Sequence, residues 1–311
     1  MKRPFFQFSP SFSSVVLIGT LWALLTVYLA LAFGMPMPGD KVPRWYSIVS
    51  YILEEGAFLG AGWLCLRNWR LPQIISDRNV WLFLGLGTLL YLMATLIFMY
   101  WEIGLERAPN VSLADPFYMV SYLLLLWGMF LALKSRGLHL RAWQWVVLAA
   151  VAASAIGFGW QIATPYDDDS ATLEQIFIAS TATLNNSDWS ILASVTGKEV
   201  PDWVLGIEKT LEPSIVILSW LYIVYDVLLL IMAATLLLNF WGGRFSRTWT
   251  LIASAALLLY IADMHFAYVA TRTDYETNSI IDTFWTLSAI FFGVGAAWEY
   301  EISTRSRRRR S

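Results

Sequence analysis

The sequence predicts an all-α fold, a polytopic membrane helical bundle of about eight transmembrane helices. The 311 residues are 58% hydrophobic and only 14% charged, whereas in soluble domains roughly a quarter of the residues are charged. The apolar residues gather in separate runs of about 20, the length that crosses the hydrocarbon core as a helix. Basic residues collect between alternate runs, as they do in cytoplasmic loops.

Each apolar run is expected to be a helix, because a helix satisfies its own backbone polar groups in lipid. The expected helices cover residues 13–34, 45–66, 79–102, 116–134, 142–163, 213–240, 248–271 and 277–300. We interpret residues 1–304 as a single transmembrane domain and residues 305–311 as a basic cytoplasmic tail.

The distribution of basic residues predicts the orientation. With both termini in the cytoplasm, most of the 21 Lys and Arg residues lie on the cytoplasmic side, and the opposite topology reverses this bias. This predicts a multi-pass protein of the inner or plasma membrane, with the lipid bilayer as a partner. The first run, which follows Lys2 and Arg3, also resembles a signal peptide, but its length favours an uncleaved anchor.

One outer loop, residues 164–212, is long. Within it, residues 201–211 place Trp203, Ile207 and Leu211 at helical spacing, which predicts an amphipathic helix lying on the outer membrane surface. The run Asp167–Asp169 could bind a divalent cation, but no EF-hand spacing follows it, which favours a solvated acidic loop.

A short internal repeat suggests how the helices are organised. Tyr118–Tyr122 resembles Tyr222–Asp226, and the helices that follow begin with Arg141-Ala142-Trp143 and Arg247-Thr248-Trp249. The matching direction indicates a parallel repeat of three helical hairpins. These hairpins would cover residues 45–102, 116–163 and 213–271.

Carboxylates inside apolar runs are the main functional signal. Glu54, Glu55, Asp226 and Asp263 lie within expected helices, and Asp282 lies near the outer end of another. An ionisable group in hydrocarbon is costly, so such residues usually face a protein interior or a wet cavity and mark function. Their positions predict a polar chamber on the outer side, in which Glu55, Asp226 and Asp263 converge.

Aromatic residues accompany these acids at helical spacing. Tyr222 lies four residues before Asp226, Tyr260 lies three before Asp263, and Trp285 follows Asp282 by three. We interpret the set as a binding pocket for a cation, an amine or another small ligand, in which aromatic rings add cation–π attraction. The alternative is an internal network in which protonated acids join helices by hydrogen bonds.

His265 is the only histidine in an expected helix, and it points to a different face from Asp263. A packed histidine is the ordinary interpretation, with pH sensing as the alternative.

Several classes of activity lack their chemical requirements. The one lysine in an expected helix, Lys134, is the last residue of its helix, so no lysine lies inside the membrane to form a retinal Schiff base. Cys65 is the single cysteine, so an internal disulfide is excluded. Phosphate-binding and common nucleophile motifs are absent. Asp226 and Asp263 resemble the paired acids of intramembrane aspartyl proteases, but the flanking motifs of that family are missing. We expect no enzyme activity, no catalytic residue and no metal site. The sequence leaves the cofactor unknown, and a net charge of −2 implies no nucleic-acid partner.

Several segments resemble the multi-pass membrane input regions that precede bacterial diguanylate cyclase (GGDEF) domains and some histidine kinases. The residues that carry the resemblance are Ser112–Tyr118, Tyr122, Lys134–Arg136, Tyr225–Asp226, Arg244–Trp249, Ile261–Tyr268 and Ser279–Trp285. The resemblance implies a sensory role. The sequence departs from the family pattern in that no output domain follows Arg310.

The sequence therefore predicts a membrane sensor or signal-transducing protein that binds a small ligand or cation from the outer side. It would act through a cytoplasmic signalling partner or a homo-oligomer. The alternative is a transporter or ion-coupled carrier that uses the same carboxylates as a cation path.

Overall fold

The computed structural model describes residues 10–34, 42–72, 74–107, 111–163, 200–243, 246–272 and 280–308. Eight helices in these ranges are long and apolar enough to cross a membrane, and the described residues contain no strand. The predicted all-α polytopic bundle is confirmed.

The transmembrane helices lie close to the predicted ranges. They are α1 (Phe12–Phe33), α2 (Arg44–Arg70), α3 (Arg78–Met99), α4 (Ala114–Arg136), α5 (Ala142–Ala163), α9 (Ile215–Asn239), α10 (Ser246–Arg272) and α11 (Thr283–Arg308). A shorter helix, α8 (Asp202–Leu211), covers the segment predicted to be amphipathic and joins α9 through the 3₁₀ turn η2 (Glu212–Ser214). The run Asp167–Asp169 lies outside the described residues.

The third and the last helix differ from the sequence prediction at their ends. The third helix continues beyond α3 as a π-helical turn, η1 (Tyr100–Gly104). The last helix begins only at Thr283, after the 3₁₀ turn η3 (Ile280–Asp282), and continues to Arg308. The basic residues from Arg305 therefore begin within the helix and not after it.

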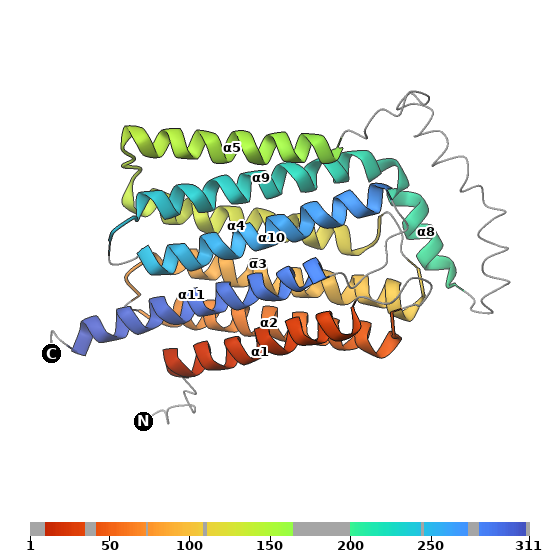
Figure 1. Ribbon diagram of the computed structural model, residues 1–311, viewed down its shortest axis with the longest axis horizontal. Helices are drawn as coiled ribbons and strands as arrows, with labels where there is room; N and C mark the ends of the chain where they lie inside the picture. Colours follow the sequence, from red (N-terminus) through yellow and green to blue (C-terminus); the bar gives the residue numbers. More distant parts are fainter. Residues whose placement is uncertain are drawn as a thin grey trace.

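Six helices form a closed ring. In order around it, α2 packs against α3, α3 against α4, α4 against α9, α9 against α10, α10 against α11, and α11 again against α2. Helix α1 packs outside this ring on α11 and α2, and α5 packs outside it on α9 and α10 (Figure 1). All the predicted site carboxylates lie on ring helices or on η3.

The two ends of the bundle differ. We call the basic end the one where α1 begins, α11 ends, and the α2–α3, α4–α5 and α9–α10 connections lie (Figure 1). The opposite end, where α8 lies tilted against the long helices, is called the acidic end. This arrangement agrees with the even number of predicted spans; the cytoplasmic location of the basic end stays a prediction.

The predicted hairpin repeat is only partly present in the packing. Helices α2 and α3 pack closely side by side, as do α9 and α10. The hairpin expected over residues 116–163 is wrong, because α5 packs on α9 and α10 while α4 packs on α3 and α9. The similar sequences before and at the start of α5 and α10 therefore did not determine which helices these two pack against.

Candidate functional site

A pair of aspartates lies inside the ring. Asp263 on α10 accepts hydrogen bonds from the Tyr122 hydroxyl on α4 and from Trp285 Nε1 on α11, at 2.7 Å. Asp226 on α9 lies beside both the Asp263 carboxyl and the Tyr122 hydroxyl. Four ring helices thus meet at this point, which we call the aspartate pair.

The two members of the pair differ in their surroundings. Asp226 is 0% exposed, whereas Asp263 is partly exposed. Neither Asp226 oxygen has a hydrogen bond of normal geometry within the ranges that the structure describes. Two unit charges about 4 Å apart repel by about 4 kcal/mol at an effective dielectric constant near 20. The aspartate pair therefore needs a proton or a cation to be stable.

Tyrosines surround the aspartate pair on two sides. The Tyr122 ring stacks on Tyr225 at 6.1 Å and meets Tyr222 edge-on at 6.2 Å. Tyr118 meets Tyr91 edge-on at 4.9 Å and donates a hydrogen bond of 3.0 Å to Thr95. These rings come from α3, α4 and α9 and form an aromatic wall with several hydroxyl groups.

A second group of acids lies nearer the acidic end. Glu54 on α2 interacts electrostatically with Asp263, Asp282 and Glu102. Glu102 accepts a hydrogen bond from the Tyr51 hydroxyl. The π-helical turn η1 carries Glu102, and such turns are frequent at functional sites. Together with the aspartate pair, Tyr122 and Trp285, these acids form what we call the acidic-aromatic cluster.

The predicted site residues take different positions. Asp226 and Asp263 interact directly, as expected for a shared pocket. Glu54 interacts with Asp263, whereas the interactions of Glu55 are with Glu54 and Tyr118. Both Glu55 oxygens are buried without a hydrogen bond from the described residues.

Three further predicted residues have defined contacts. The Tyr260 hydroxyl donates a hydrogen bond of 2.9 Å to the Ala155 carbonyl and so attaches α5 to α10, and the Tyr260 side chain also interacts with Asp226. The Tyr222 hydroxyl donates to Asp115 Oδ1 at 2.8 Å. His265 Nδ1 lies 3.9 Å from Asp282 Oδ1.

Asp115 has a structural role at the start of α4. The Ser112 hydroxyl accepts from the Ala114 backbone N–H, and the Asp115 carboxylate accepts from the Ser112 backbone N–H at 2.6 Å. These two bonds fix the turn that precedes α4 and place Asp115 in the first turn of the helix. They hold the carboxylate where Tyr222 reaches it.

Sequence reasoning did not assign Tyr118 and Tyr122 to the site. They are four residues apart, so they share one face of α4. That spacing was a usable signal, and Asp115 lies three residues before Tyr118, but the nearest acid on this helix is seven residues from Tyr122. Tyr122 gains its importance from Asp263, which lies 141 positions away in the sequence.

Another buried carboxylate lies at the basic end. Glu299 on α11 is 0% exposed and accepts hydrogen bonds from the Ser76 hydroxyl at 2.8 Å and the Thr248 hydroxyl at 3.1 Å. Trp81 Nε1 donates to the same Ser76 hydroxyl at 2.7 Å. Glu299 therefore joins α11 to the start of α10 and to the α2–α3 connection.

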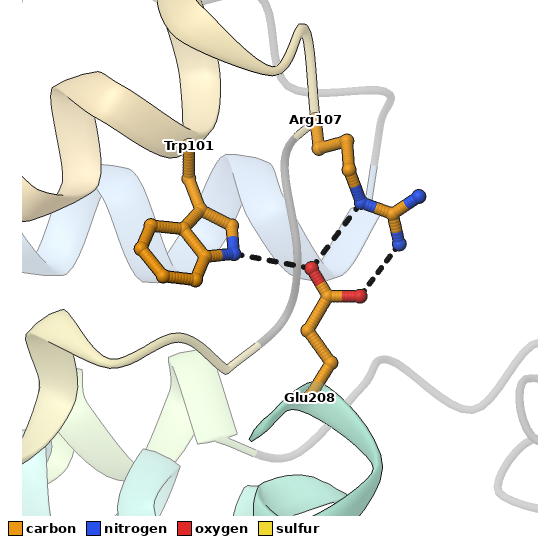
Figure 2. A network of polar contacts seen from close by, with 3 residues as sticks. All are labelled: Trp101, Arg107 and Glu208. Atoms are coloured by element: carbon orange, nitrogen blue, oxygen red, sulfur yellow. Dashed lines mark hydrogen bonds and ion pairs between the residues drawn. The ribbon is translucent and has the colours of Figure 1, made fainter. Parts of the chain in front are cut away.

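An ion pair attaches α8 to the acidic end of the bundle. Arg107 donates two hydrogen bonds to the Glu208 carboxylate, of 2.6 and 3.2 Å, and Trp101 Nε1 donates a third of 3.1 Å (Figure 2). The Arg107 and Glu208 side chains are only 13% and 16% exposed. Since Trp101 belongs to η1, the position of α8 is linked to the turn that carries Glu102.

Among the described residues, no three His, Cys, Asp or Glu side chains are arranged to hold a metal ion. No family model matches the chain, and no curated protein or solved structure matches it significantly. The resemblance to membrane input regions therefore stays a prediction, and function has to be argued from the geometry of the cluster.

Proposed function

We propose that the protein is a membrane sensor in which the acidic-aromatic cluster binds a small cation and α11 transmits the change to the basic end. The observation that carries the proposal is the contact of Asp263 with Tyr122 and Trp285. A cation at this carboxylate competes with both donors. Because Trp285 belongs to α11, weakening its bond to Asp263 alters the packing of α11 against α10.

Helix α11 has the contacts needed to carry such a change. It holds Trp285 at the cluster and Glu299 at the basic end, which are separated by roughly 21 Å along a continuous helix at about 1.5 Å per residue. Between them, Ser288 donates to the Ala255 carbonyl. A shift of α11 at the cluster therefore changes the hydrogen bonds that Ser76 and Thr248 donate to Glu299 at the basic end.

The packing between the two ends favours sensing over transport. Leu259, Ile252 and Phe292 are at most 1% exposed and fill the ring between the cluster and Glu299. A cation that crosses this layer loses its solvation without gaining polar partners, which is costly. The transporter alternative requires this layer to open, whereas sensing requires only a shift in helix packing.

The test compares two tryptophans of the same helix. Trp285→Phe removes the N–H that Asp263 accepts but keeps an aromatic ring, whereas Trp298→Phe removes an N–H with no acceptor among the described residues. Spin labels at positions 70 and 305, both exposed, report the distance between α2 and α11 after Cys65→Ser. Acid, Na⁺ and methylammonium serve as probes in lipid nanodiscs.

We expect at least one probe to change the distance in the parent chain and in Trp298→Phe. In Trp285→Phe, the response should be reduced at least several-fold, because the cluster has lost its bond to α11. Equal responses in the two variants contradict the proposed route. If a probe crosses the membrane of reconstituted vesicles, and Asp226→Asn stops this flux, the result favours the transporter.

A further inference from the structure

The members of the aspartate pair have unequal hydrogen-bond partners. Asp263 accepts from two donors, Tyr122 and Trp285, and is partly exposed. Asp226 is fully buried, and no donor in the described ranges supplies either of its oxygens with a bond of normal geometry. Hydrogen-bond donors stabilise the ionised form of an acid, whereas burial without donors stabilises its neutral form. The surroundings therefore favour a carboxylate at Asp263 and a neutral carboxyl group at Asp226.

Within the part of the chain that the structure describes, the groups that interact with the pair supply no positive charge. The titratable side chains that interact with it are Glu54 from α2, Tyr91 from α3, Tyr122 from α4, Tyr222 from α9 and Tyr260 from α10. From α11 the pair receives the uncharged N–H of Trp285. Each of these groups is an acid or is neutral, so none of them compensates a second negative charge.

The space around Asp226 restricts what can compensate it. Both of its oxygens are closed to water in this structure. A hydrated ion or an ammonium group needs several oxygen partners and room beside them. A proton binds a single carboxyl oxygen and needs no additional space. A proton between the two carboxyl groups also completes the hydrogen bonding of Asp226, which becomes a donor to Asp263.

Building on the proposed sensing function, we propose that Asp226 and Asp263 hold a single proton, carried on Asp226 and donated to the Asp263 carboxylate, and that this proton is the cation the cluster senses. Binding takes the pair from two negative charges to one, and release returns it to two. Because release separates two like charges, the proton state is coupled to the spacing of α9 and α10, and through Trp285 to α11.

Among the described residues, the polar side chains next to the aspartate pair extend toward the acidic end. The Tyr222 hydroxyl donates to Asp115 in the first turn of α4, and the Tyr222 ring contacts the ring of Tyr122, whose hydroxyl donates to Asp263. Toward the basic end, Leu259 and Ile252 on α10 and Phe292 on α11 are packed and apolar. The pair should therefore exchange protons with the solution at the acidic end and not with that at the basic end.

Infrared spectroscopy of the full chain in lipid tests the proton count. The carbonyl stretch of a protonated carboxyl group is separate from the carboxylate bands, so variant-minus-parent spectra at neutral pH count lost protonated groups. Asp226→Asn should lose one such band, and the double variant with Asp263→Asn should lose the same one. Asp77→Asn, which changes an exposed carboxylate at the start of α3, should lose none.

Three results overturn the proposal. The double variant loses no band, the double variant loses two bands, or Asp226→Asn retains the band. Asparagine is nearly isosteric, and a circular dichroism spectrum equal to that of the parent shows that each variant is folded. If a variant is unfolded, the count is taken on the parent chain labelled with ¹³C at aspartate carboxyl groups, where a shifted protonated band must be present.

Sidedness and sensing are tested separately. In vesicles with one orientation, an alkaline step on the acidic-end side should remove the band, and a step on the basic-end side should leave it. A band that responds only from the basic end contradicts the proposed route. If the band behaves as expected while the 70–305 distance is independent of pH, the shared proton stands and the proposed sensing function fails.

Discussion

Tyr122→Phe is the sharpest test of the aspartate pair's architecture. The variant keeps the ring that stacks on Tyr225 and removes only the hydroxyl that Asp263 accepts. Tyr122 is 1% exposed, so no solvent replaces the lost donor. A hydrogen bond to a charged group contributes about 1.5–3 kcal/mol, and we expect Tyr122→Phe to lower the free energy of unfolding by about 2 kcal/mol.

The matched control is the other member of the stack. Tyr225→Phe removes a hydroxyl for which the described residues give no hydrogen bond, and it should change the free energy of unfolding by less than about 0.5 kcal/mol. Reversible unfolding in mixed micelles, or steric trapping in lipid bicelles, measures both values. The same change made in an Asp263→Asn background should cost less, because a neutral acceptor binds a hydroxyl more weakly than a carboxylate does.

The reasoning is refuted if Tyr122→Phe and Tyr225→Phe destabilise equally. It is refuted as well if Tyr122→Phe costs the same with and without the Asp263 carboxylate. In either case the hydroxyl acts through packing alone, and the aspartate pair is not held by charge-assisted bonds.

Two further predictions test the surrounding packing. A Cβ at Gly62 would lie 2.6 Å from the Leu89 side chain, whereas one at Gly60 meets nothing within 4 Å; Gly62→Ala should therefore lower the thermal midpoint through about 1–3 kcal/mol of overpacking, and Gly60→Ala should not lower it. Glu208→Gln weakens the buried ion pair of α8 with Arg107, so amide hydrogen exchange in α8 should accelerate about tenfold. Glu106→Gln, which changes the more exposed pair with Arg44, should leave this exchange rate unchanged. Equal exchange rates in the two variants contradict the attachment of α8 by Glu208.

The helices and the carboxylates were readable from the sequence because both depend on local properties. An apolar run of about 20 residues in lipid has to satisfy its own backbone, so each predicted run became a helix at nearly the predicted bounds. Asp226 and Asp263 stood out for the same reason, since a carboxylate within such a run is costly. The amphipathic spacing of residues 201–211 likewise predicted the helix α8, whose position on the outer membrane surface stays a prediction.

The meeting of side chains was decided only by the tertiary structure. Helical spacing gives Glu54, Glu55 and Tyr260 a face on their own helices, but not the neighbour that the face meets. That neighbour depends on the order of the helices around the ring and on the rotation of each about its axis. Hence Glu54 interacts with Asp263, whereas Tyr260 attaches α5.

Tyr122 shows the same limit most clearly. In the sequence it is one tyrosine among 14, on a helix whose only acid in the described span lies in the first turn. In the fold, α4 and α10 bring its hydroxyl to the Asp263 carboxylate. The sequence alone shows which acids require partners, because an acid within an apolar run is costly to bury. The packing of six helices into a closed ring determined which partners they received, because in lipid the choice among apolar neighbours rests on shape and on a few polar contacts.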